Sequence, residues 1–186
     1  MLRTLFALAA LALLPVTGRA DDVDSGPDKD KKVPALKVHD RTGKNKDKEI
    51  DYVARRKDKA TIYLLLPADK FDRPMARFMK KLDTKVDEDF EDVYIVAVWL
   101  TDDLDKTKKY LPKVQQSINY DKTALTCVKG TEGPKGWNIN SDAHMTVVIA
   151  HKGKVVSKTG YKSLNDTDVP GVIKALKKVA KEKKKE

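Results

Sequence analysis

The chain has 186 residues, enough for one domain with short extensions, and 35% of them are charged. Its formal net charge is +10, and its one cysteine excludes an internal disulfide. The excess charge is mostly lysine without interleaved aromatic residues, so we expect no nucleic-acid partner.

The first 20 residues have the pattern of a signal peptide. Met1–Arg3 is a basic start, Thr4–Val16 is apolar, and small residues precede the end at Ala20. The apolar run of about 13 residues is shorter than the roughly 20 that a membrane-spanning helix needs. No later stretch is long enough to span a bilayer. We therefore predict an exported protein, periplasmic or secreted, cleaved after Ala20, with an uncleaved anchor as the alternative.

Charged segments flank the rest of the chain. Residues 21–32, DDVDSGPDKDKK, lack apolar anchors and are predicted to be a disordered linker. Residues 181–186 form a basic tail, predicted to be a solvated helix end or a contact with an anionic surface. The domain itself is expected to span residues 33–180.

The stretch Lys59–Val86 combines a buried strand with an amphipathic helix. Ile62–Leu66 is a continuous apolar run that suits a strand covered on both faces, and Pro67 ends it. Asp72 is a candidate N-cap, followed by Pro74 in the first helical turn. The apolar residues of this helix then recur on one face: Met75, Phe78, Met79, Leu82 and Val86.

Similar patterns predict the other elements. Strands are expected at 33–40, 93–100, 123–128, 145–150 and 155–158, a strand or helical turn at 50–53, and helices at 101–119 and 169–180. Pro112 should kink or split the first of these helices. Strand–helix–strand crossovers imply parallel pairing, and the late hairpin implies antiparallel pairing. This predicts an α/β fold with a mixed central β-sheet flanked by helices.

The element order and several segments resemble the thioredoxin-like superfamily, in particular its redoxin and TlpA-type branch. Pro34–Lys44 is similar to the segment with which that branch begins. Lys59–Leu66 looks like the strand before its active site, and Met145–Gly160 looks like its late hairpin. The resemblance covers residues 33–180 and implies a three-layer thioredoxin-like fold.

The resemblance also implies a thiol site, but the expected residues are missing. Catalytic members carry Cys-x-x-Cys or a peroxidatic cysteine where the strand enters the helix, and Ala68–Arg73 contains no cysteine. Members also place a cis-proline before the late hairpin, where this chain has His144 and Met145. A cis bond at a non-proline residue costs about 2.5–4 kcal/mol, so we expect a trans bond there.

Without thiols, this face is predicted to be a binding surface for an extracytoplasmic protein or peptide. A partner could pair with the backbone of Ala143–Thr146. Trp137 is either a contact for that partner or a core residue beneath a long loop. The predicted surface comprises Ala68, Asp69, Lys70, Phe71, Asp72, Arg73, Trp137, His144 and Met145.

Alternatives remain for Cys127. It is either a buried structural thiol or, in the rival hypothesis, the nucleophile of a thiol-dependent oxidoreductase or peroxidase, which requires an exposed thiolate. A third hypothesis is an envelope or nucleic-acid-associated basic protein bound through Lys174–Lys185. His39, His144 and His151 lack metal-ligand spacing, so neither a metal nor another cofactor is predicted, and nothing indicates an oligomeric state.

Overall fold

The computed structural model describes residues 22–183. The predicted signal peptide and the last three residues of the basic tail lie outside the described residues. The strands are β1 (Asp22–Val23), β2 (Lys37–Asp40), β3 (Glu49–Asp51), β4 (Thr61–Pro67), β5 (Tyr94–Thr101), β6 (Thr123–Lys129), β7 (Met145–His151) and β8 (Lys154–Tyr161). The helices are α1 (Tyr52–Arg56), α2 (Arg73–Asp89), α3 (Leu104–Ile118) and α4 (Val169–Leu176), with short 3₁₀ turns η1 (Ala68–Lys70) and η2 (Asp166–Asp168).

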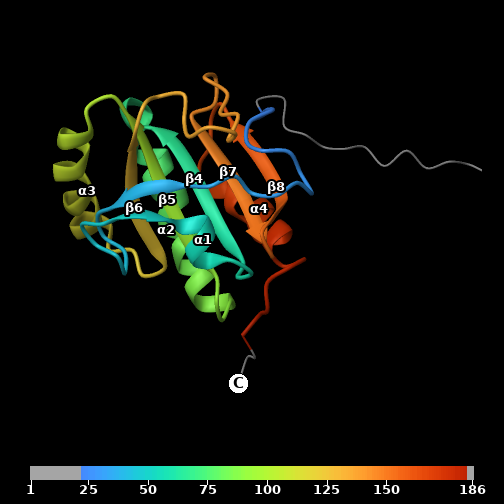
Figure 1. The fold of residues 1–186 in the computed structure, drawn as a ribbon. Coiled ribbons are helices and arrows are strands. Elements are labelled where there is room, and N and C mark those ends of the chain that lie inside the picture. The colour runs from blue at the N-terminus through green and yellow to red at the C-terminus, as the bar shows by residue number, and fades with distance from the viewer. Residues whose placement is uncertain (1–21, 184–186) are drawn as a thin grey trace, which may run out of the picture.

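Eight strands within residues 22–183 form one mixed sheet in the order β1-β8-β7-β4-β5-β6-β2-β3. β4, β5 and β6 are parallel, and β7, β8, β2 and β3 extend the sheet by antiparallel pairing. Helix α2 covers one face together with α3 and α4, and α1 lies on the other (Figure 1). The predicted fold class is confirmed. No helix among the described residues is long and apolar enough to cross a membrane.

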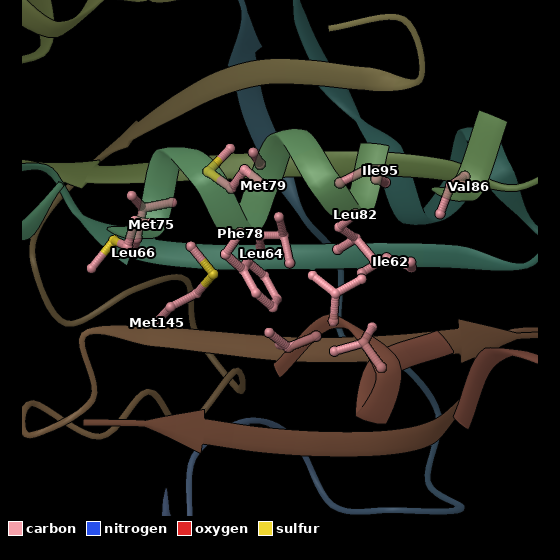
Figure 2. Packing of buried hydrophobic residues seen from close by; sticks show 14 of the residues in the cluster. Ile62, Leu64, Leu66, Met75, Phe78, Met79, Leu82, Val86, Ile95 and Met145 are labelled. Carbon is pink, nitrogen blue, oxygen red and sulfur yellow. The ribbon is translucent and has the colours of Figure 1, made fainter. Parts of the chain in front are cut away.

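Helix α2 packs on β4 through the predicted apolar face. Met75, Phe78, Met79, Leu82 and Val86 are all buried. Figure 2 shows Phe78 and Leu82 pointing from the helix toward the side chains of β4. Each fully buried side chain of this kind stabilises the folded protein by about 1.5–3 kcal/mol, so this face fixes the position of α2 on the sheet.

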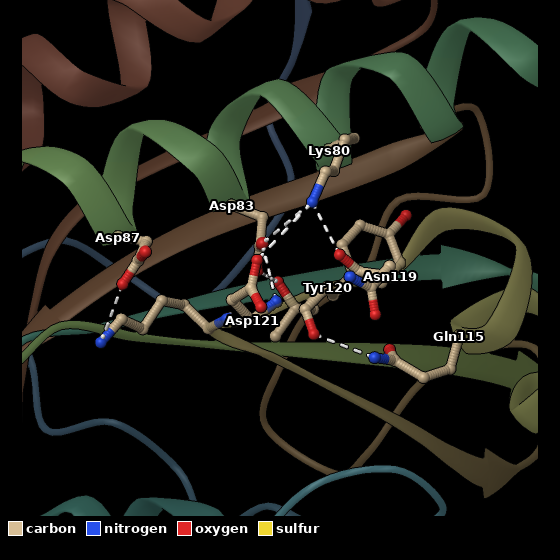
Figure 3. A network of polar contacts seen from close by, with 9 residues as sticks. Lys80, Asp83, Asp87, Gln115, Asn119, Tyr120 and Asp121 are labelled. Carbon is tan, nitrogen blue, oxygen red and sulfur yellow. Dashed lines mark hydrogen bonds and ion pairs between the residues drawn. The ribbon is translucent and has the colours of Figure 1, made fainter.

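A buried carboxylate ties the second half of α2 to the segment before β6 (Figure 3). Asp83 is fully buried and accepts hydrogen bonds from the amides of Asp121 and Lys122, each at 2.9 Å, and from the Thr123 hydroxyl at 2.6 Å. Lys80 adds an ion pair at 3.9 Å and donates to the Asn119 carbonyl at 2.6 Å. Because its acceptors are satisfied, the buried charge is tolerated and orients the helix.

The predicted break at Pro112 does not occur. Helix α3 runs without interruption from Leu104 to Ile118. Proline cannot donate to the carbonyl four residues earlier, which is that of Lys108. Arg41 supplies the missing donor, because its Nε–H bonds this carbonyl at 3.0 Å.

The prediction of a disordered linker is wrong for its described part, residues 22–32. Strand β1 pairs with β8, and the Asp30 amide bonds the Val155 carbonyl at 2.8 Å. Ser25 is buried, and its hydroxyl lies 2.6 Å from that of Thr146. Backbone and hydroxyl hydrogen bonds to the sheet hold this segment, and its composition does not reveal them.

The basic tail also makes contacts where it is described. The Glu91 amide bonds the Lys181 carbonyl, and the Lys183 amide bonds the Asp89 carbonyl at 2.8 Å. Residues 181–183 therefore run beside the C-terminal end of α2. The ambiguous segment 50–53 contains both predicted structures, because β3 ends at Asp51 and the same residue caps α1.

Candidate functional site

The junction between β4 and α2 has the architecture of an anion site. β4 ends at Pro67, η1 follows, and α2 begins at Arg73. The exposed Asp72 is the N-cap, and its carboxylate accepts a hydrogen bond from the Met75 amide at 2.9 Å. A helix N-terminus stabilises negative charge through its free amides and its dipole. Here a carboxylate of the chain itself occupies that position.

The predicted surface residues fall into exposed and buried groups. Asp69, Asp72 and Arg73 are exposed, and Ala68, Lys70, Phe71 and His144 are partly buried. Trp137 and Met145 have no exposed surface. Only the first two groups can contact a partner, so the assignment of Trp137 and Met145 to a binding surface is corrected.

Trp137 is a core residue. Its ring packs edge-to-face on Tyr63 with centroids 5.3 Å apart, and its Nε1–H donates to the Ala35 carbonyl at 3.1 Å. Its apolar body and its polar atom are thus both satisfied inside the protein. Met145 points into the other core layer, toward α2 (Figure 2).

The backbone of Ala143–Thr146 is not available for pairing with a partner. The His144 amide donates to the Tyr161 carbonyl at 2.7 Å. Thr146 pairs with Leu65 on one side and Gly160 on the other, because β7 lies between β4 and β8. This part of the prediction is wrong. The expected trans geometry is confirmed, since residues 22–183 contain no cis peptide bond.

Hollows lie on both sides of the loop Ala68–Phe71. The larger, called here the loop hollow, has a volume of about 800 Å³. It separates Pro67, Asp69 and Lys70 from the loop Thr131–Gly136. Lys70 reaches across and donates its ammonium group to the Ser141 carbonyl at 2.8 Å. In the sequence, the glycines and proline of Thr131–Gly136 indicated a loop, but they did not indicate that this loop faces η1.

The second hollow, called here the aromatic hollow, lies between the same loop and α3 and has a volume of about 330 Å³. Phe71 packs edge-to-face on Trp99 with centroids 5.2 Å apart. Tyr110, which is 46% exposed, also lines this hollow. The buried Nε1–H of Trp99 has no hydrogen-bond partner among the described residues. Trp99 lies in an apolar run and Tyr110 in a helix, so neither signalled a pocket in the sequence.

No protein-family model matches the sequence, and no curated protein matches it. Solved structures do. A peroxiredoxin-like protein from Aquifex aeolicus matches with a TM-score of 0.56 at 16% identity, over 85% of this chain and 88% of that one. A putative thiol:disulfide interchange protein DsbE from Chlorobium tepidum matches with a TM-score of 0.54 at 13% identity, over 84% and 98%. BsSco, a member of the Sco family of cytochrome c oxidase assembly proteins, matches with a TM-score of 0.53 at 16% identity, over 82% and 98%.

The fold is thioredoxin-like. At these low sequence identities, the matches show a shared fold alone. In this thioredoxin-like fold, the junction that positions a nucleophile in catalytic members carries Asp72 at the helix N-cap and the buried Met75 in the first turn. Neither side chain can form or break a disulfide.

Cys127 lies elsewhere, in β6, opposite Trp99 of β5 and His39 of β2. Its side chain is fully buried on the core face, as expected from its shared face with Leu125. Burial raises the pKa of the Cys127 thiol to about 11, and the nearby cations Lys108 and Arg41 offset this only in part. The reactive thiolate is therefore scarce at neutral pH, and solvent does not reach it.

Metal-binding groups do not converge in the described part of the chain. No cluster of three His, Cys, Asp or Glu side chains within residues 22–183 could hold an ion. His39 lies 3.7 Å from Glu49, a surface contact between adjacent strands.

Proposed function

We propose that the chain is an exported, non-catalytic thioredoxin-like module that binds an extracytoplasmic protein or peptide. Export is inferred from the signal-peptide pattern of residues 1–20. The binding surface is centred on the loop Ala68–Phe71. The observation that carries the proposal is the pair of hollows beside this loop, at a helix end whose capping position holds a carboxylate and no thiol.

The aromatic hollow suits an apolar side chain of a peptide. Its volume lies at the lower end of the roughly 300–1,000 Å³ typical of ligand pockets. Phe71 and Tyr110 supply aromatic walls, and the buried Trp99 supports Phe71 from behind; aromatic side chains are characteristic of binding hot spots.

The loop hollow suits the polar continuation of the same peptide. Asp69 and Lys70 line it from η1, and Glu132 and Lys135 line it from the facing loop. Mixed charges at a rim contribute more to selectivity and association rate than to affinity. We therefore expect an apolar anchor to dominate the binding energy.

The test is selection of peptides from a random display library on the chain from residue 22 onward, followed by measurement of Kd by fluorescence polarisation. Tyr110→Ala and Phe71→Ala should each weaken the selected peptides by about tenfold or more, which corresponds to about 1.4 kcal/mol. Lys113→Ala is the matched control, because Lys113 is exposed on α3 and does not line either hollow. Unchanged affinity in both aromatic variants, or a failure to select any peptide, would overturn the proposal.

A further inference from the structure

A cationic pocket lies at the opposite end of the sheet, where β4 and β5 begin. It has a volume of about 200 Å³ and is independent of the surface around Ala68–Phe71. Its lining comes from the turn after β2, from α1 and the segment after it, and from the first residue of β5. These residues are Lys44, Asn45, Tyr52, Arg55, Arg56, Lys59 and Tyr94.

Arg56 is held rigidly in this pocket. Its Nε–H donates to the Thr61 hydroxyl at 3.1 Å, and its Nη2 donates to the carbonyls of Ala60 and Asp92 at 3.1 and 2.7 Å. Its guanidinium also lies 5.5 Å from the centre of the Tyr94 ring. The planar group is thus oriented before any ligand arrives, which lowers the entropic cost of binding.

One edge of the Arg56 guanidinium remains available. Nη1 makes no hydrogen bond to a described residue, and its nearest carboxylate oxygen, on Asp92, is 3.8 Å away. Nη1 carries N–H groups that point in fixed directions, a geometry suited to carboxylate or phosphate oxygens. The Arg56 side chain is only 15% exposed, so bulk water competes weakly for this edge.

The charges around the pocket leave a positive excess. Lys44, Arg55, Arg56 and Lys59 contribute four cations to its wall. Asp92 pairs with Lys59 at 2.8 Å, and the buried Asp40 accepts the Tyr52 hydroxyl at 2.6 Å. Among the described residues, Lys44 and Arg55 have no ion-pair partner. Burial raises the pKa of both Tyr52 and Tyr94, so the two phenols add no negative charge.

We propose that this pocket binds a compact oxyanion, the phosphate or carboxylate group of a small solute. The anion contacts the free edge of Arg56, and Arg55 and Lys44 close over it. The partly exposed Tyr94 forms an apolar wall for the body of the solute, and the buried Tyr52 supports it by stacking, with ring centroids 6.3 Å apart and planes inclined by 25°. The small volume admits one such group with a flat substituent.

The test uses the chain from residue 22 onward at low salt, titrated with inorganic phosphate, phenyl phosphate and benzoate. Binding is followed by calorimetry and by amide chemical shifts. We expect saturable binding of at least one probe, with shifts confined to residues 44–59 and the start of β5. The phosphate and carboxylate probes distinguish the two sources of the oxyanion.

The decisive variant is Lys44→Gln/Arg55→Gln, because both side chains are exposed and unpaired and their loss leaves the core intact. It should weaken binding by about tenfold or more. The matched control, Lys46→Gln/Lys57→Gln, removes the same charge from exposed neighbours outside the pocket and should change the affinity less than about threefold. Absence of saturable binding, or an equal loss in both double variants, would overturn the proposal.

Discussion

Two ionisable side chains, Asp72 at the N-terminus of α2 and Cys127 in strand β6, lie in opposite environments. At the helix end, the Asp72 carboxylate is exposed and bonded by a helix amide, where negative charge is favoured. In β6, the Cys127 thiol is enclosed in the core, and burial raises its pKa to about 11. The fold thus provides a place that stabilises an anion, and the chain puts its cysteine in another place.

The largest effect is expected when the thiol is moved from β6 to the N-terminus of α2. In Asp72→Cys/Cys127→Ala, the introduced thiol stands at the helix N-cap, where thiol pKa values fall to about 7.5 or lower. At pH 7 it should react with a chromogenic disulfide at least about 100 times faster than Cys127 does in the wild-type chain. Its thiolate fraction is about 1,000 times larger, the lower nucleophilicity of a more acidic thiol offsets part of this, and burial shields Cys127 from the reagent.

Denatured wild-type protein is the control for this experiment, since its thiol should react at the ordinary rate. Comparable reaction rates for the two thiols in the folded proteins would contradict the contrast between the helix end and β6.

A second test measures the cost of ionising Cys127 through the pH dependence of stability. The folded pKa is raised from 9.0 to about 11, so the stability that this thiol contributes is complete below pH 9 and is lost as the pH rises toward 11. Between pH 8 and pH 10, the wild-type chain should lose about 1.3 kcal/mol more of its free energy of unfolding than Cys127→Ala does.

Urea unfolding of both proteins at pH 8, 9 and 10 measures this difference. The buried tyrosines, whose pKa values are also raised, are common to both proteins and cancel. Parallel losses in the two proteins would show that the thiol ionises freely in the folded state.

The smallest effect concerns the cap itself. Asp72→Ala removes the acceptor of the Met75 amide and should lower the free energy of unfolding by about 1 kcal/mol, whereas Asp72→Asn should cost a few tenths. Asp69→Ala is the control, since Asp69 is exposed and its carboxylate accepts no hydrogen bond seen among the described residues. Equal stability of Asp72→Ala and the wild type in denaturant titrations would show that the Asp72 cap does not stabilise the protein.

Local patterns predicted the elements that build the junction. The continuous apolar runs of β4 and β5 and the stripe from Met75 to Val86 signal burial within a few residues of sequence. The missing cysteine at the helix start was also visible, because it concerns a single short segment. The fold class therefore followed from the sequence.

The errors arose where burial depends on distant partners. Trp137 is enclosed by Tyr63 and bonded to Ala35, which is 102 residues away in sequence. Ser25 reaches Thr146, 121 residues away. The two hollows and the cationic pocket are also lined by residues from separate segments. Local sequence periodicity does not predict such long-range contacts.

Our central proposal is that this thioredoxin-like domain performs no thiol chemistry. It is tested most directly by assaying insulin-disulfide reduction with dithiothreitol and peroxide consumption, using the chain from residue 22 onward and its Cys127→Ala variant. The account predicts that both proteins give the uncatalysed background rate in both assays. Turnover by the wild-type chain that disappears in Cys127→Ala would contradict it.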